Sequence, residues 1–249
     1  MKMDKKKVNA IIQARCGSTR FPEKVFAEID GKPLIWHVVD RLRYVETIDE
    51  IIVATTTNPK DDNLESWCVK ENIKCFRGSE KDVLNRYYQA SLAFPCEAVV
   101  RITADDPFKE PSVIDKVIRR LIEGNYDLVT NNFPPSFPEG LDCEALTISA
   151  LEKMEKSTND DFEREHVTQY IYHHPDIFKI GNVSSEIQLS SYRWTIDNKE
   201  DYDMVKAIYE KRDKTRKGIL LMGEILDILG LYPEIMSINS KVKRSTMYQ

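Results

Sequence analysis

Short apolar runs alternate with stretches of helical periodicity over more than half of this 249-residue chain. The run from Val8 to Gln13, for example, precedes a stretch from Pro33 to Val45 in which apolar residues recur at helical spacing. This alternation is typical of βαβ units, in which helices connect parallel strands. The chain is therefore expected to adopt an α/β fold with a mostly parallel central sheet and helices on both faces.

The same patterns place individual elements. We expect strands near Val8–Gln13, Glu50–Ala54, Lys74–Phe76, Ala98–Ile102 and Asp127–Thr130. We expect the intervening helices near Pro33–Val45, Asp61–Glu71, Asp82–Ala93 and Pro111–Glu123. Each loop that leaves the carboxyl end of such a strand is a place where ligands of open α/β sheets bind.

A proline-rich segment at residues 131–140 interrupts the alternation and is predicted to be a loop or lid. Beyond it we expect strands near Cys143–Thr147, Phe178–Asn182 and Tyr192–Thr195, and helices near Ser149–Lys156, Arg164–His173, Lys199–Arg212 and Ile219–Leu229. No linker-like stretch divides the chain. We therefore expect a single domain over residues 1–249, with a segment at about residues 131–182 inserted within it.

Charge and cysteine content exclude several classes of partner. The chain carries 36 Lys and Arg against 41 Asp and Glu, a net charge of −5, which disfavours broad attraction to nucleic acid or to an anionic membrane. The charged start from Met1 to Lys7 precedes only a short apolar run, so neither a signal peptide nor a membrane span is expected. The five cysteines include no close zinc-type pair and are expected to be reduced thiols in a cytoplasmic protein.

The first predicted strand opens into a cationic loop that suits phosphate groups. Gly17 allows a sharp turn that exposes backbone N–H groups, and Ser18 and Thr19 add hydroxyl donors. Positive charge comes from Arg15, Arg20 and Lys24. The loop lacks both the closing Lys-Ser or Lys-Thr pair of a Walker P-loop and the three glycines of a dinucleotide fingerprint. We interpret it as a polyphosphate cradle; the alternative is an ordinary strand-to-helix turn with solvated charges.

A bound triphosphate needs a hard cation, and two aspartates at strand ends have the oxygen ligands for it. Asp105 follows the predicted strand Ala98–Ile102, and Asp197 follows Tyr192–Thr195. Because both leave the carboxyl end of a strand, we predict that they bind Mg²⁺ together. The alternatives are a turn residue for Asp105 and a helix N-cap for Asp197. Asp106 could exchange roles with Asp105, and the sequence leaves that choice open.

Seven blocks follow one another along the chain: QARCGSTRFPEK at 13–24, IIVATTTNPKDD at 51–62, FRGSEKDVLNRYY at 76–88, VRITADDP at 100–107, FPEGLDCE at 137–144, REHVT at 164–168 and RWTIDNKEDY at 193–202. In these blocks the chain resembles the cytidylyltransferase family that includes CMP-Kdo and CMP-acylneuraminate synthetases, and within it the spore coat polysaccharide biosynthesis protein F group. The resemblance implies a Rossmann-like nucleotide-diphospho-sugar transferase fold.

The resemblance also implies roles for individual residues. The nucleotide-binding set comprises Ala14, Arg15, Gly17, Ser18, Thr19, Lys24, Arg77, Gly78, Ser79, Arg86 and Thr103. The acceptor-binding set comprises Glu139, Asp142, Glu144, Arg164, Glu165 and His166. Catalysis is assigned to Arg15, Lys24 and Asp105, and the metal to Asp105 and Asp197. His166 could equally be a histidine that is hydrogen-bonded within the core.

The implied reaction is attack of an acceptor oxygen on the α-phosphorus of CTP with release of pyrophosphate, for surface polysaccharide or glycan biosynthesis. A sugar acid would give a CMP-linked product and a phosphorylated acceptor a CDP-linked one; the sequence does not decide between them. The alternatives are an NDP-sugar-dependent glycosyltransferase of related topology and a non-catalytic nucleotide-binding protein. Because members of the cytidylyltransferase family that the chain resembles commonly form dimers, we expect a homodimer. The segment at about residues 131–182 is expected to provide acceptor and dimer contacts.

Overall fold

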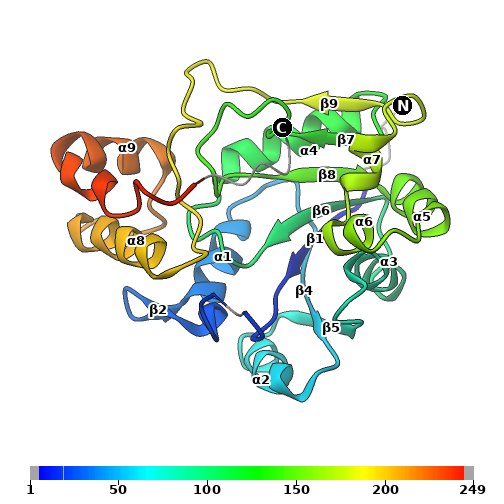
Figure 1. Cartoon of the computed structure of the whole chain (residues 1–249), viewed down its shortest axis with the longest axis horizontal. Coiled ribbons are helices and arrows are strands. Elements are labelled where there is room, and N and C mark those ends of the chain that lie inside the picture. The colour runs from blue at the N-terminus through cyan, green and yellow to red at the C-terminus, as the bar shows by residue number, and fades with distance from the viewer. Residues whose placement is uncertain (1–5, 19, 244–249) are drawn as a thin grey trace.

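A computed structural model describes residues 6–18 and 20–243 of the chain. Seven strands within these residues form one sheet in the order β5-β4-β1-β6-β8-β7-β9 (Figure 1). Their bounds are β1 Val8–Gln13, β4 Glu50–Thr56, β5 Lys74–Gly78, β6 Ala98–Thr103, β7 Leu128–Thr130, β8 Glu144–Thr147 and β9 Ile180–Asn182. The short strands β2 (Glu28–Ile29) and β3 (Lys32–Pro33) pair with each other in a separate antiparallel hairpin.

The sheet is mostly parallel, as the sequence predicted. Strands β5, β4, β1 and β6 pair in parallel, and β7 pairs in parallel with β9. Only β8, among the described strands of this sheet, runs against its neighbours, because it pairs antiparallel with both β6 and β7. The amino end of β8 therefore lies at the same edge of the sheet as the carboxyl ends of β1 and β6.

Helices cover both faces of the sheet (Figure 1). Their bounds are α1 Leu34–Leu42, α2 Asp62–Lys70, α3 Val83–Ala93, α4 Pro111–Glu123, α5 Ile148–Ser157, α6 Asp161–His166, α7 Gln169–His173, α8 Lys199–Lys211 and α9 Met222–Leu231. Short 3-10 turns are η1 Lys24–Phe26, η2 Pro59–Asp61 and η3 Pro233–Ser237. In the described part of the chain, no helix has the length and apolar character needed to cross a membrane.

Alternate side chains of β1 pack into two different apolar cores, because successive side chains of a strand point to opposite faces of the sheet. Ala10 and Ile12 pack with residues of α1, α2 and α4 on one face. Ile11 packs with residues of α3, α5 and α7 on the other face. Because both faces are covered, the central strands β1 and β6 are mostly apolar.

A third apolar cluster lies beside the sheet and carries the segment that ends at Asp197. Trp194, which is fully buried, packs there with Phe108 and with residues of α8 and α9. The strand expected at Tyr192–Thr195 is not formed within the described residues; only a single parallel bridge joins Glu139 to Arg193. The pairing does not extend past this bridge, where Gly140 adopts φ 102°.

The helix expected at Arg164–His173 is two helices, α6 and α7. Between them Val167 adopts φ 63°, a positive value that costs free energy for a β-branched residue. The next residue, Thr168, donates its hydroxyl to the carboxylate of Glu144 on β8 at 3.1 Å. Tertiary contact with the sheet thus overrides a continuous helical pattern.

Candidate active site

A cavity of about 550 Å³ opens at the carboxyl edge of β1 and β6. Six segments that are distant in sequence form it: the loop after β1, the end of β6, residues 132–144, the end of α6, residues 193–197 and the last described residues. Its lining includes Gln13, Ala14, Arg15, Ser18, Arg20, Lys24, Arg101, Thr103, Asp105, Asp106, Asn132, Glu139, Asp142, Glu144, His166, Arg193, Thr195, Asp197, Val242 and Lys243. This is the edge at which open α/β sheets bind ligands.

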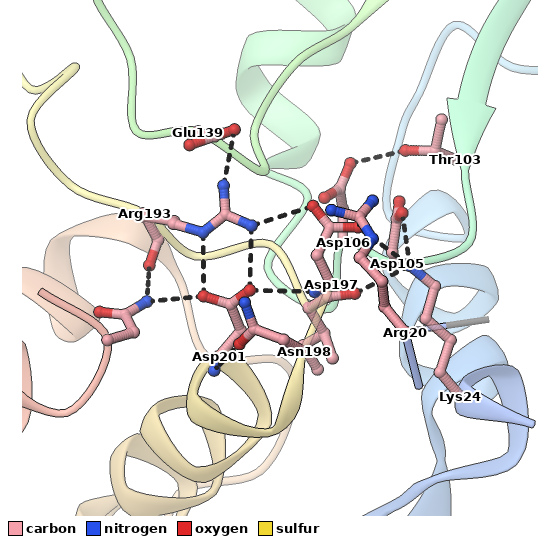
Figure 2. Close-up of polar contacts among 12 residues, drawn as sticks. Arg20, Lys24, Thr103, Asp105, Asp106, Glu139, Arg193, Asp197, Asn198 and Asp201 are labelled. Carbon is pink, nitrogen blue, oxygen red and sulfur yellow. Dashed lines mark hydrogen bonds and ion pairs between the residues drawn. The ribbon is translucent and has the colours of Figure 1, made fainter. Parts of the chain in front are cut away.

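The ammonium group of Lys24 joins the two aspartates that the sequence singled out (Figure 2). Its Nζ lies 2.9 Å from Asp105 Oδ2 and 3.3 Å from Asp197 Oδ1. It also donates to the carbonyl of Ile196 at 2.9 Å. The two carboxylates therefore converge on one point, although they are distant in the sequence.

The backbone brings these carboxylates together as well. The N–H of Ile196 donates to the carbonyl oxygen of Asp105 at 2.9 Å, which ties the segment before Asp197 to the end of β6. Burial alone would raise the pKa of Asp105, but the nearby charge of Lys24 lowers that pKa to about 2. Asp105 is therefore ionised and available as a cation ligand at neutral pH.

Arg193 fixes the second aspartate. Its Nη2 donates to Asp197 Oδ2 at 2.9 Å, while Nε and Nη2 bind both oxygens of Asp201 at 2.9 Å (Figure 2). Its Nη1 lies 2.9 Å from Glu139 Oε1. Burial disfavours the charge of Arg193, yet the carboxylates of Asp201 and Glu139 raise its pKa above the ordinary arginine value. The side chain of Asp197 is thus held by a permanently charged, buried guanidinium.

The structure distinguishes Asp105 from Asp106, a choice that the sequence left open. Asp106 is 4% exposed, lies 2.8 Å from the buried ammonium of Lys109 and accepts from the hydroxyl of Thr103 at 2.8 Å. Burial raises the pKa of Asp106. Asp106 is therefore engaged by its own structural partner, and Asp105 is the residue that faces Lys24.

The base of the cationic loop is fixed to the sheet. The N–H of Cys16 donates to Asp61 Oδ1 at 2.7 Å, and Asp61 also accepts from the hydroxyl of Thr56 at the end of β4. Burial, followed by the charge of Asp61, raises the pKa of Cys16 to about 12, so this thiol stays neutral. Arg15 and Arg20, in contrast, extend into the cavity lining.

Several residues of the predicted nucleotide-binding set meet at the cavity. Ala14, Arg15, Ser18, Lys24 and Thr103 line it. Gly17 lies on the same loop but not in the described lining, and Thr19 lies outside the described residues.

None of the four residues expected to border the base and ribose, Arg77, Gly78, Ser79 and Arg86, is part of the described cavity lining. Arg77 donates to the carbonyls of Thr56 and Asn58 and pairs with carboxylates of α2, so it joins β5 to that helix. Arg86 is 1% exposed and donates to the carbonyl of Ser79. A Cβ added at Gly78 would lie 3.0 Å from the Arg86 side chain, so only glycine leaves room for it. Nucleotide contact by these four residues stays a prediction.

Only some of the predicted acceptor residues line the cavity. Glu139, Asp142, Glu144 and His166 line the cavity, whereas Arg164 and Glu165 are not part of the described lining. The Arg164 guanidinium lies 2.7 Å from Asp82 Oδ2 and 2.8 Å from Glu155 Oε2. Arg164 therefore joins three helices, and this placement does not favour the acceptor role expected of it.

Glu144 and His166 show different chemistry within the cavity. The carboxylate of Glu144 receives hydrogen bonds from Arg101 at 2.7 Å, Tyr172 at 2.7 Å and Thr168 at 3.1 Å. It is therefore occupied by protein donors. Burial lowers the pKa of His166, so its imidazole is neutral near pH 7 and is able to accept a proton or a hydrogen bond.

Arg101 and Arg193 were not among the site residues predicted from the sequence, although both belong to a repeated sequence pattern. The stretches Arg101-Ile-Thr-Ala-Asp105 and Arg193-Trp-Thr-Ile-Asp197 share the pattern Arg-x-Thr-x-Asp. In each, the arginine and the aspartate line the same cavity. A repeated motif that ends in the two convergent carboxylates would have identified both arginines.

The donor set fits a small divalent cation. In the described part of the chain, no cluster of three or more His, Cys, Asp or Glu side chains is arranged as a metal site. Two carboxylates that already share one cationic group match Mg²⁺, which takes one or two protein carboxylates and completes its shell with phosphate oxygens and water. Asp105 and Asp197 are the residues that would hold it.

A basic loop and two convergent carboxylates, at the carboxyl edge of such a sheet, define an enzyme that handles a nucleoside triphosphate: a nucleotidyltransferase. Residues 9–226 match the family model described as cytidylyltransferase, and the chain belongs to that family.

Individual relatives agree with this assignment. The chain is 34% identical over 233 residues to the spore coat polysaccharide biosynthesis protein SpsF of Bacillus subtilis, covering 90% of this chain and 94% of that protein. It is 34% identical over 123 residues to the 3-deoxy-manno-octulosonate cytidylyltransferase of Geobacter metallireducens, 47% of this chain and 45% of that protein. A solved structure of a cytidylyltransferase from Leptospira borgpetersenii matches with a TM-score of 0.87 and 29% identity, over 93% of this chain and 97% of the other.

Proposed function

We propose that this cytidylyltransferase transfers CMP from CTP to a sugar acid, releases pyrophosphate and supplies an activated sugar for surface polysaccharide biosynthesis. The names of two relatives support the substrate class, since one acts in polysaccharide biosynthesis and another on 3-deoxy-manno-octulosonate. The observation that carries the proposal is the convergence of Asp105 and Asp197 on Lys24, at 2.9 and 3.3 Å.

In this proposal the cationic loop positions the triphosphate. Arg15 and Arg20 line the cavity and carry guanidinium groups that match phosphate oxygens. Burial disfavours the charge of Lys24, but the carboxylates of Asp105 and Asp197 raise its pKa, so it stays protonated. When CTP enters, Lys24 is able to exchange part of its contact with the aspartates for contact with a phosphate.

The chemical step forms one bond and breaks one. A hydroxyl oxygen of the acceptor attacks the α-phosphorus, the bond from that phosphorus to the oxygen bridging to the β-phosphorus breaks, and pyrophosphate leaves with the electron pair. Arg15 and Lys24 stabilise the charge that develops on the leaving group. Mg²⁺ held by Asp105 and Asp197 would supply further neutralisation of the α-phosphate. His166, neutral and in the same cavity, is suited to accept the acceptor's proton.

Pyrophosphate release tests the proposal. Purified protein is incubated with Mg²⁺, with CTP, UTP, GTP or ATP, and with 3-deoxy-manno-octulosonate, an N-acylneuraminate or a sugar phosphate. We expect release that requires CTP and a sugar acid, together with a CMP-linked product in the mass spectrum. Release with a sugar phosphate alone would instead indicate a CDP-linked product.

The same assay separates the two other classes. A glycosyltransferase would consume an NDP-sugar without releasing pyrophosphate. A non-catalytic protein would bind CTP, seen as a raised melting temperature, without turnover. The homodimer and the cytoplasmic location stay predictions; light scattering on the purified protein tests the former.

A further inference from the structure

The last described residues of the chain return to the cavity. After α9 and η3, Asn239 is 6% exposed and donates from Nδ2 to Asp201 Oδ1 and to the carbonyl of Arg193, each at 3.0 Å. The N–H of Val242 then donates to the carbonyl of Asn239 at 2.9 Å. The C-terminal segment is thereby fixed to the same Arg193 that holds Asp197.

This anchor places a lysine at the cavity. Val242 and Lys243 both belong to the cavity lining, together with Glu139 and Asp142. Lys241, two residues earlier, is exposed and is not part of the described lining. The segment therefore presents one of two neighbouring lysines to the substrate space.

The charge of Lys243 is available, in contrast to that of other cations in the cavity. Lys24, Arg101 and Arg193 each lie within 2.9 Å of a carboxylate oxygen of Asp105, Glu144 and Glu139, respectively. Among residues 6–18 and 20–243, no carboxylate forms an ion pair with Lys243. An ammonium group in this position is suited to an anion that the substrate brings.

We propose that Lys243 binds the anionic group of the acceptor, a carboxylate or phosphate on the sugar, and thereby makes the C-terminal segment a determinant of acceptor specificity. The inference rests on the proposed nucleotidyl transfer. The triphosphate already has Arg15, Arg20 and Lys24 on the loop after β1. Lys243 instead comes from the segment fixed to Arg193, whose guanidinium contacts Glu139, one of the residues expected to bind the acceptor.

A kinetic comparison of two variants tests the assignment. Lys243→Gln removes the charge in the cavity, and Lys241→Gln removes a matched charge outside it. We expect Lys243→Gln to raise the KM for the sugar acid about tenfold or more, in line with a charge-assisted hydrogen bond, and to leave the KM for CTP within about twofold. Lys241→Gln should change neither constant. An unchanged acceptor KM, or an effect confined to CTP, overturns the assignment while leaving the nucleotidyl transfer intact.

A binding readout keeps the test independent of turnover. Surface amines are acetylated with and without 3-deoxy-manno-octulosonate or a sugar phosphate, and modification is measured at each lysine by mass spectrometry. We expect the anionic sugars to protect Lys243 several-fold and Lys241 not at all. Protection by only one of the two sugars identifies the anion as carboxylate or phosphate. If wild-type protein releases no pyrophosphate, the proposed function fails; equal labelling of Lys243 with and without both sugars refutes this inference separately.

Discussion

Arg193 and Asp197 are joined by a hydrogen bond of 2.9 Å from Nη2 to Oδ2, four residues apart on a segment that forms no helix or strand. The guanidinium belongs to a buried network in which Asp201 is fully buried and binds it through both oxygens. The direction of the Asp197 carboxylate is therefore set by a rigid side chain rather than by regular backbone pairing.

Replacing Arg193 should affect stability and catalysis in separable ways. Arg193→Gln leaves Asp201 buried without its charged partner, so the free energy of unfolding should fall by about 3–5 kcal/mol in urea unfolding. Arg193→Lys keeps the charge but not the planar fork, so it should recover part of that stability. Its kcat should stay at least tenfold low because Asp197 is no longer directed. A lysine variant with wild-type kcat would refute the positioning role.

Asp105 and Asp106 should behave oppositely although they are adjacent. Asp105→Asn should lower the rate of pyrophosphate release roughly 10²-fold or more. Because the lowered pKa of Asp105 indicates that its charge stabilises the fold, the variant should also lose some stability, but less than Asp106→Ala. Asp106→Ala leaves the ammonium of Lys109, which is 1% exposed, without its carboxylate, so it should lower the free energy of unfolding by about 3–5 kcal/mol. Kinetics and thermal unfolding on both proteins decide this. The reverse pattern would assign the metal to Asp106.

Gly140 is required by the close approach of two segments at the cavity. Its φ is 102°, and a Cβ there would lie 2.7 Å from the backbone nitrogen of Thr195. Gly140→Ala should therefore destabilise the fold by more than about 2 kcal/mol and disturb the Asp197 segment. Gly223 in α9 has open space around its Cβ position, so Gly223→Ala is the matched control and should stabilise slightly. Equal urea midpoints for Gly140→Ala and Gly223→Ala would contradict the requirement for glycine at position 140.

His37 should make stability depend on pH. Burial is the main cause that lowers the pKa of His37 to about 4, and its Nε2 donates to the carbonyl of Ile29 at 2.7 Å. Between the ordinary value of about 6.5 and pH 4, the unfolded chain binds a proton that the folded chain does not. The free energy of unfolding should therefore fall as pH falls, by about 2 kcal/mol from pH 7 to pH 5.

A variant isolates this contribution. His37→Gln retains a side-chain donor for Ile29 but does not titrate, so it should lose most of the dependence on pH in that range. The measurement is the urea midpoint at pH 7, 6 and 5 for both proteins. If both lost stability in parallel, His37 would not be the responsible group.

The sequence predicted the α/β class, the parallel sheet and most element positions because long periodic segments report burial directly. It failed where contacts distant in sequence decide the backbone. Val167 breaks a helical pattern because Thr168 bonds to Glu144 on β8, and the segment at Tyr192–Thr195 makes a single bridge, next to Gly140 with its φ of 102°. Neither effect can be recognised from the residues that neighbour it in the sequence.

Prediction of the candidate site succeeded and failed for the same reasons as prediction of the fold. The cationic loop and the two aspartates were recognisable from their residue types, and the structure brings Lys24, Asp105 and Asp197 together. Arg164 looked equally suitable by charge, yet its guanidinium pairs with Asp82 and Glu155. Which of many arginines is free for a ligand depends on neighbours that only the tertiary structure supplies.

The central claim is that Asp105 and Asp197 hold one divalent ion together with CTP. Binding of Mn²⁺ in the presence of CTP, followed by electron paramagnetic resonance, tests it without requiring turnover. Asp105→Asn and Asp197→Asn should each weaken Mn²⁺ binding at least tenfold, and the double variant should be little worse than either single one, because both remove the same site. Wild-type Mn²⁺ affinity in either single variant would contradict the claim.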